Sequence, residues 1–333
     1  METIIPIIDL DKLTEPNTDI TKFPNHLAQI VDQIRDALHK VGFMYLTNHR
    51  ISNEVINSAF TASANFFNLD QELKEKYRKI PINTNHGWIK AGQELLHPNS
   101  VFELREGFDF VSGEGRPILE CPDFSPTMDT FKRECQKFMK LVLLPLLSRS
   151  LGLDDPNFFN NCCTHLDDSN AGNECDLRAI YYPPIPNETE IPVGTIRCAE
   201  HTDYELCTLL FQDDIGGLEV KTSLGKWTSA TPIPGSILVN TGDLLEQWTS
   251  GYFPATKHRV IIPGKEIDRR MTRYSFAYFF APDNSTIISP LTSRSSILQK
   301  FCNGEENYWN DKASTAPTAY EHIIAKVKAA YQY

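Results

Sequence analysis

The sequence predicts a mainly β protein with flanking helices, in which a largely helical first half precedes a series of short strands. In the first half, apolar residues recur at helical spacing, whereas from Arg178 to Phe280 short apolar segments alternate with turns rich in Gly, Pro and Asp. A chain of 333 residues can form one integrated unit of this kind. Within it we expect an N-terminal helical region (1–175), a strand-rich core (176–285) and a C-terminal helical segment (286–333).

Three helices are expected in the first half and one near the end of the sequence. Apolar stripes predict the first two, over residues 27–38 and 55–67. The third should begin at Pro126, with Ser125 placed to cap its first turn. The last is expected over residues 319–331.

A histidine and an aspartate stand two positions apart at His201 and Asp203, before the apolar segment that starts at Leu206. In an extended chain, side chains two positions apart project from the same face, so both can contact one ion. A third ligand from the distant His258 would complete a set of two histidines and one carboxylate. This set is typical of non-haem Fe(II) in oxygen chemistry, although it also suits the zinc of a hydrolase.

Arg273 begins a hydrophobic strand, where an unpaired guanidinium would be costly. Its planar donors suit bidentate binding of a carboxylate, from a ligand or from an internal acidic residue, and Ser275 on the same face can add a hydroxyl donor. Strand alternation then predicts an inward face and an outward face. The inward face would carry Arg273, Ser275, Ala277 and Phe279, and the outward face Tyr274, Phe276, Tyr278 and Phe280.

Ordered landmarks occur along nearly the whole chain. Before His258 they include residues 4–10, 41–49, 66–69, 74–77, 87–94, 181–184, 212–218 and 240–248. In these segments, and in the His-x-Asp, His and Arg-x-Ser motifs, the sequence resembles the Fe(II)/2-oxoglutarate-dependent dioxygenases, specifically the isopenicillin N synthase-like branch. The resemblance implies a double-stranded β-helix, or jelly-roll, core.

The resemblance also implies the chemistry and its residues. The iron ligands would be His201, Asp203 and His258, and the 2-oxoglutarate-binding residues would be Arg273, Ser275 and Tyr182. With Fe(II), 2-oxoglutarate and O2, and with ascorbate as an optional reductant, such an enzyme oxidises an unactivated C–H bond and releases succinate and CO2. Hydroxylation is the default outcome, and desaturation or ring closure would use the same protein parts.

The stretch between His258 and Arg273 is longer than in plant members of that group. Residues 262–268 predict an extended hairpin loop. A register slip of one residue there would turn Arg273 to the wrong face. Arg269 and Arg270 are the alternative anchors, but neither has a serine two positions further on, so Arg273 is preferred.

Composition limits the partners. The chain has 32 basic and 43 acidic residues, a net charge of −11 and no basic stripe, which argues against nucleic acid or an anionic membrane as the main partner. We expect a cytoplasmic monomer or weak dimer that acts on a small molecule, with all eight cysteines as free thiols. Phe279, Tyr204 and Trp88 are the candidate substrate contacts. The alternative functions are a non-catalytic 2-oxoglutarate sensor and a zinc-dependent hydrolase.

Overall fold

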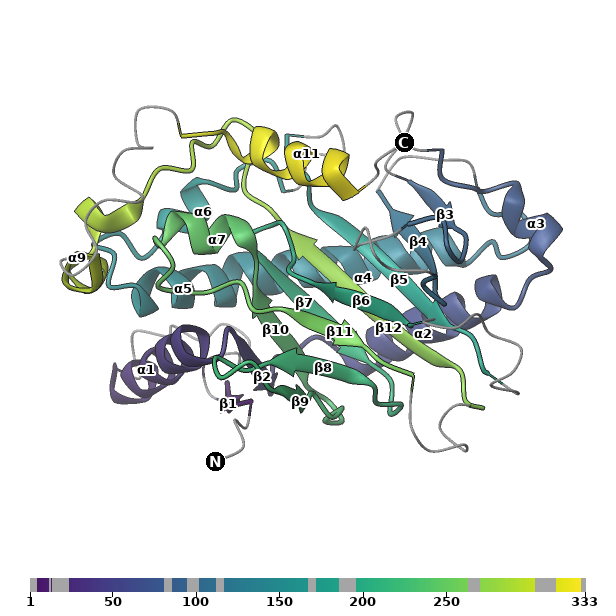
Figure 1. Ribbon diagram of the computed structural model, residues 1–333, viewed down its shortest axis with the longest axis horizontal. Coiled ribbons are helices and arrows are strands. Elements are labelled where there is room, and N and C mark those ends of the chain that lie inside the picture. The colour runs from purple at the N-terminus through teal and green to yellow at the C-terminus, as the bar shows by residue number, and fades with distance from the viewer. Residues whose placement is uncertain are drawn as a thin grey trace.

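Two β-sheets face each other and carry the interior of the protein between them (Figure 1). The computed structural model describes residues 5–11, 13, 24–80, 86–94, 102–111, 117–166, 172–185, 196–262, 270–302 and 316–330. The large sheet has the order β1 (Ile7–Asp9), β2 (Phe43–Thr47), β10 (Ile237–Thr241), β7 (Cys207–Gln212), β12 (Arg273–Phe280), β5 (Asp176–Tyr182), β4 (Glu106–Phe110) and β3 (Gly87–Ile89). The small sheet has the order β6 (Cys198–His201), β11 (His258–Val260), β8 (Leu218–Lys221) and β9 (Trp227–Ser229).

Neighbouring strands are antiparallel throughout both sheets except for the pair β1 and β2, which is parallel. Side chains from both sheets pack together between them, among them Tyr182, Leu238 and Ala277 from the large sheet and Cys198, Val220 and Val260 from the small one. This is the mainly β, jelly-roll arrangement that the sequence predicts. The N-terminal region is more than helical, because it also supplies strands β1 and β2 on one side of the large sheet and β4 and β3 on the other.

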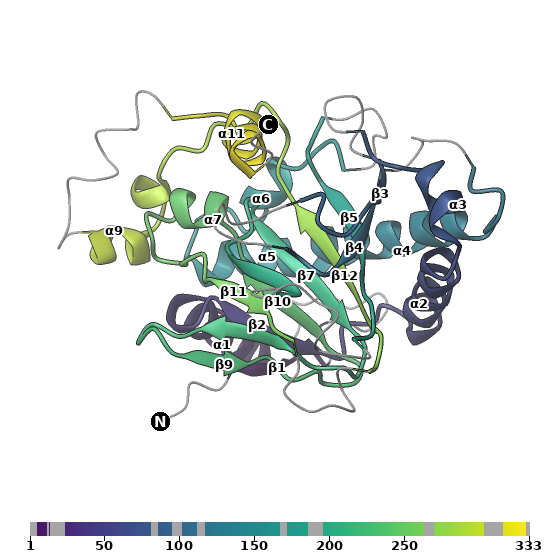
Figure 2. The same ribbon diagram turned by 45° about the vertical axis from the view of Figure 1, so that its right-hand side comes forward.

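Helices cover the outer face of the large sheet, and Figure 1 shows α4 and α5 behind its strands. The helical elements are α1 (Pro24–Lys40), α2 (Asn53–Phe67), α3 (Gln71–Glu75), α4 (Phe124–Phe138), the π-helical turn η2 (Met139–Leu143), α5 (Leu144–Ser150), α6 (Phe158–Asn161), α7 (Asp243–Trp248), the 3-10 turn η4 (Leu291–Arg294), α9 (Ser296–Cys302) and α11 (Ala319–Ala330). Figures 1 and 2 both show α11 above the two sheets. The four expected helices are therefore confirmed, as α1, α2, α4 and α11.

The expected start of the third helix is wrong. Helix α4 begins at Phe124 with Asp123 at the N-cap position, and no side chain caps it. Ser125 therefore lies inside the first turn rather than before it. Pro126 is tolerated there because the first amide groups of a helix have no partner within the helix.

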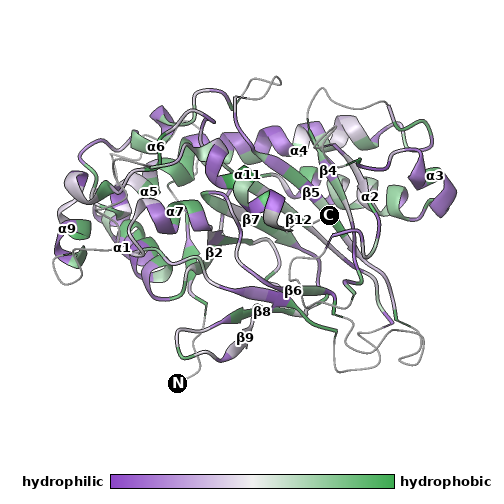
Figure 3. Ribbon diagram, turned by 45° about the horizontal axis from the view of Figure 1, so that its top comes forward, coloured by the Kyte–Doolittle hydropathy of each residue, from purple (hydrophilic) through white to green (hydrophobic). Residues whose placement is uncertain are grey.

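Strand β12 alternates between the two faces of the large sheet as expected. On the outer side, the ring of Phe276 lies 4.9 Å from that of Phe60 in α2 and 5.2 Å from that of Phe131 in α4. On the inner side, Ala277 and Phe279 pack with the cluster between the sheets. Figure 3 shows that β7 and β12 are mostly hydrophobic, whereas α4 carries many hydrophilic residues.

The register of β12 determines which residues lie at the two ends of the space between the sheets. At one end Arg273 pairs with Tyr182 of β5, and at the other end Phe279 pairs with Asp176 of β5 and Thr208 of β7. These ends are about 20 Å apart, since an antiparallel strand rises about 3.4 Å per residue. A binding group at Arg273 is thus well separated from one at Asp176.

All eight cysteines are free thiols, as expected. Among the described residues, no helix combines the length and the apolar composition needed to cross a lipid bilayer.

Candidate active site

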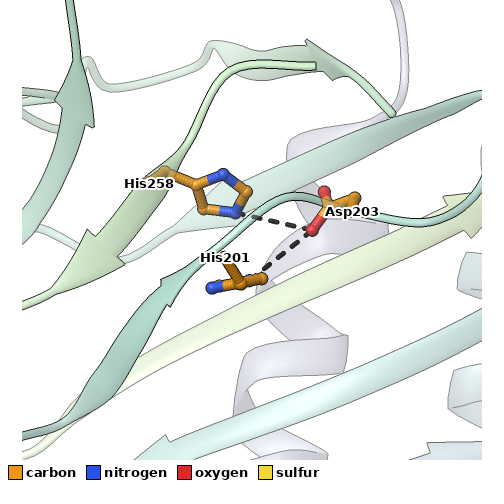
Figure 4. A group of neighbouring side chains, drawn as sticks. All are labelled: His201, Asp203 and His258. Carbon is orange, nitrogen blue, oxygen red and sulfur yellow. Dashed lines mark ion pairs between the residues drawn. The ribbon is translucent and has the colours of Figure 1, made fainter. Parts of the chain in front are cut away.

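His201, Asp203 and His258 converge between the two sheets. Each offers a ligand atom, and these atoms all lie within 4.8 Å of one another. Oδ1 of Asp203 is 3.6 Å from Nε2 of His201 and 3.4 Å from Nε2 of His258 (Figure 4). The two histidines are brought together because β11 pairs with β6 so that His258 lies opposite His201. Asp203 lies just beyond the end of β6, so the turn after the strand, rather than the strand itself, places its carboxylate.

Backbone carbonyls orient both imidazoles. Nδ1 of His201 lies 2.8 Å from the carbonyl oxygen of Ala199, and Nδ1 of His258 lies 3.1 Å from that of Thr256. A carbonyl oxygen only accepts hydrogen bonds, so each Nδ1 carries the hydrogen. The lone pair of each Nε2 then faces Asp203, which is the tautomer that a metal-binding histidine needs.

The Asp203 carboxylate is held by one of its two oxygens. Oδ2 accepts hydrogen bonds from the hydroxyl of Thr208 and, at 2.7 Å, from the side-chain amide of Asn240. Oδ1 is left facing the two histidines. Although burial alone would raise the pKa of this carboxyl, His258, His201 and Asn240 lower it below its usual range. Two imidazoles and one oriented carboxylate fit a divalent iron ion.

Arg273 is 1% exposed, and its hydrogen-bond partners are all neutral. Its Nη2 donates to Gln212 Oε1 at 2.8 Å, its Nε to the carbonyl oxygen of Ile215 at 3.1 Å, and its Nη1 to Ser275 Oγ at 3.3 Å. The guanidinium carbon is 4.8 Å from the centre of the Tyr182 ring. Within the described residues no carboxylate forms an ion pair with Arg273, and the nearby Asp213 carboxylate instead accepts hydrogen bonds from the backbone amides of Ile215 and Tyr274.

The group of His201, Asp203 and His258 lines the same cavity as Arg273, and the volume of this cavity is about 540 Å³. Its walls include the candidate metal ligands His201, Asp203 and His258, the expected co-substrate anchors Arg273, Ser275 and Tyr182, and the expected substrate contacts Tyr204 and Phe279.

Trp88 does not line this cavity. Its side chain is 1% exposed, and its indole nitrogen donates a hydrogen bond to Glu106 at 2.7 Å. Trp88 lies opposite Phe108 in the sheet and packs with it in the core beneath the helices, so we do not include Trp88 in the substrate pocket. Among the alternative anchors, Arg270 is exposed and does not line the cavity, while Arg269 and residues 263–268 of the expected hairpin loop lie outside the described residues.

A network of buried charges, which sequence reasoning missed, forms another part of the wall. Nε of Arg178 lies 2.5 Å from Asp109, its Nη1 lies 2.9 Å from Glu94, and Lys79 Nζ lies 2.5 Å from Asp109. Burial would raise the pKa of Asp109, but Arg178 and Lys79 hold it well below its usual range. An aspartate between two phenylalanines in the segment 106–110 was the available signal, because such a residue needs a buried partner.

The fold and the site define a non-haem iron oxygenase. Residues 173–282 match the 2OG-Fe(II) oxygenase superfamily. Residues 5–127 match a second family, whose description is "non-haem dioxygenase in morphine synthesis N-terminal". The chain belongs to the 2OG-Fe(II) oxygenase superfamily. It is a 2-oxoglutarate-dependent dioxygenase that uses iron and 2-oxoglutarate.

Relatives resemble the chain over most of its length. The chain is 33% identical over 291 residues to proline hydroxylase buaE of Petromyces alliaceus, covering 82% of this chain and 88% of that protein. It is 30% identical to the 2-oxoglutarate-dependent dioxygenase htyE of Aspergillus rugulosus, covering 77% and 82%. Among solved structures, a full-length Neurospora crassa protein in complex with alpha-KG and thymine matches with a TM-score of 0.81 and 27% identity, over 98% of this chain and 97% of that one.

Proposed function

We propose that this enzyme oxidises an unactivated C–H bond of a small molecule, with hydroxylation as the default outcome and desaturation or ring closure as variants. The observation that carries the proposal is a single cavity that joins the His201, Asp203 and His258 group to the buried cation of Arg273. Bound iron and 2-oxoglutarate supply the activation of O2, and 2-oxoglutarate leaves as succinate and CO2.

The residues of the chain divide the binding work. Nε2 of both histidines and Oδ1 of Asp203 would hold the iron. Arg273 and Ser275 would bind the distal carboxylate of 2-oxoglutarate, and the hydroxyl of Tyr182 would donate a further hydrogen bond. Burial and the apolar lining would keep water from the reacting centre. The cavity volume and the thymine complex of the Neurospora crassa relative support a small-molecule substrate.

The two alternative functions leave parts of the site without a purpose. A zinc hydrolase needs the three ligands and a water molecule, but it has no use for a buried arginine with only neutral partners. A non-catalytic sensor would bind 2-oxoglutarate, but it would not need a second part of the cavity lined by Tyr204 and Phe279. The oxygenase therefore accounts for more of the described residues than either alternative does.

Succinate formation tests the proposed function. Purified protein loaded with Fe(II) should convert 2-oxoglutarate to succinate in air, and protein loaded with zinc alone should not, because zinc cannot supply the redox chemistry. The measurement is succinate by chromatography with each metal and with none. Turnover with zinc and none with iron would contradict the proposal.

Phe279 should position the substrate. Its ring lines the cavity, and Arg178 lies 5.9 Å from the ring centre, so the ring has a defined place beside the charged network. Phe279→Ala is expected to lower the ratio of oxidised product to succinate severalfold, because misplacing the reacting C–H bond harms the chemical step more than it harms co-substrate binding. Both products are measured together with a substrate of the parent enzyme.

Phe279→Leu is the matched control. Leucine keeps most of the apolar volume and should keep most of the coupling. An unchanged ratio in a folded, active Phe279→Ala variant would remove Phe279 from the substrate pocket.

A further inference from the structure

Lys132 of helix α4 lies in the wall of the cavity with almost no partner. Its side chain lines the cavity, although the residue is only 6% exposed. Its ammonium group has three hydrogen-bond donors, and within the described part of the chain its one hydrogen-bond acceptor is the carbonyl oxygen of Cys175 at 3.5 Å. A buried ammonium left in this state is costly unless an acceptor from outside the chain joins it.

The other cationic side chains of the described wall already have partners or an assigned role. Lys79 and Arg178 pair with Asp109, Arg105 pairs with Glu103 at 2.8 Å, and Arg133 pairs with Asp129 at 2.6 Å. Glu174 accepts a hydrogen bond from Asn284 at 2.9 Å. In the proposed function, Arg273 binds the co-substrate and Asp203 binds the metal. Among the cations of the described wall, Lys132 is therefore left without an acidic partner and without an assigned ligand.

Asp176 is an acidic neighbour of Lys132, yet the two do not form an ion pair. Its Oδ1 is buried and has no hydrogen-bond partner. Burial, and then the negative charge of Asp109, raise the pKa of Asp176 above its usual range. Asp176 therefore does not supply Lys132 with a direct anionic partner.

Lys132 lies where it can contact a substrate, at the opposite end of β5 from the co-substrate anchor Arg273. Cys175, which it contacts, directly precedes β5, whose other end pairs with Arg273. The iron ligand Asp203 accepts a hydrogen bond from Thr208, and Thr208 pairs with Phe279 at the Lys132 end of the strands. The cavity reaches the surface at this end, because the exposed Arg133 also lines it.

We propose that Lys132 binds a carboxylate of the substrate, so that the enzyme selects small organic acids whose carbon skeleton extends from Lys132 past Phe279 toward the metal. This inference rests on the proposed function. One ammonium with free donors matches the single charge of a carboxylate, whereas a phosphate would leave extra charge uncompensated among cations that are already paired.

Matched acids and amides test this inference. The probes are benzoate and benzamide, cyclopentanecarboxylate and its amide, and L-proline and L-prolinamide. Each is titrated by ligand-observed NMR or calorimetry into protein loaded with Fe(II) and 2-oxoglutarate under nitrogen, so that Arg273 is already occupied. The parent should bind at least one acid more tightly than its amide. Lys132→Met should weaken that acid by about 10- to 150-fold, as expected for the loss of a charge-assisted hydrogen bond, and leave its amide unchanged.

Two further variants separate charge from packing. Lys132→Arg should keep most of the preference for the acid, since the positive charge remains. Lys137→Met, on the same helix but exposed and 3.9 Å from Glu134, should behave like the parent. No acid preference in the parent, or a preference that survives in Lys132→Met, would overturn the inference. Succinate formation by the same preparations separates the two claims, because an active parent without acid preference contradicts only the role of Lys132, and an inactive parent contradicts the proposed function.

Discussion

Replacing Asp203 by alanine is expected to remove nearly all 2-oxoglutarate turnover and most iron binding. The carboxylate is the only anion in the metal group, and its Oδ1 faces both histidines at 3.4 and 3.6 Å. Loss of a hydrogen-bond partner around a metal site typically costs about 10- to 100-fold in affinity or activity, so loss of the ligand itself should cost more. Iron content after dialysis and succinate formation are the two measurements.

Thr208→Val is the matched control for the metal ligand. Valine keeps the shape of threonine but removes the hydroxyl that donates to Oδ2 of Asp203. We expect a loss of about 10- to 100-fold, clearly smaller than that of Asp203→Ala, because Asn240 still holds the same oxygen at 2.7 Å. If Asp203→Ala retained iron and turnover while Thr208→Val lost both, the assignment of the ligand would be wrong.

Local patterns were enough to predict the inward-facing residues. The alternation of side chains along a strand has a fixed period of two, so the sequence predicts that Arg273 and Phe279 share a face. The structure confirms this, since both line the cavity. The convergence of His201 with Asp203 follows from the same short spacing, although the turn after β6, rather than an extended strand, produces it.

Contacts that depend on strand register could not be predicted in this way. Asp109 meets Arg178 because β4 pairs with β5 so that these two residues lie directly opposite each other. Nothing in the local sequence fixes that register. Lys132 reaches the cavity from a helix on the outer side of the sheet, which periodicity assigns to packing alone. Trp88 lies opposite Phe108 in the sheet and packs with it in the core beneath the helices, a face that its local sequence does not specify.

Arg273→Lys is expected to weaken 2-oxoglutarate binding and leave iron binding intact. In the parent, Gln212, Ser275 and the carbonyl oxygen of Ile215 hold the three guanidinium nitrogens in one orientation beside the Tyr182 ring. Lysine keeps the charge but loses this fixed plane and the bidentate geometry. Loss of one charge-assisted hydrogen bond costs about 1.5–3 kcal/mol, or about 10- to 150-fold in affinity.

The measurement is calorimetric titration of 2-oxoglutarate into the Fe(II)-loaded variant under nitrogen, with iron affinity determined separately. Arg270→Lys is the matched control, because Arg270 is exposed, does not line the cavity and should bind 2-oxoglutarate as the parent does. An unchanged affinity in Arg273→Lys would place the anchor elsewhere, with Arg269 and Arg270 next to be tested. Weakened 2-oxoglutarate binding with unchanged iron binding would instead show that Arg273 and the group of His201, Asp203 and His258 act as separate binding groups within one cavity.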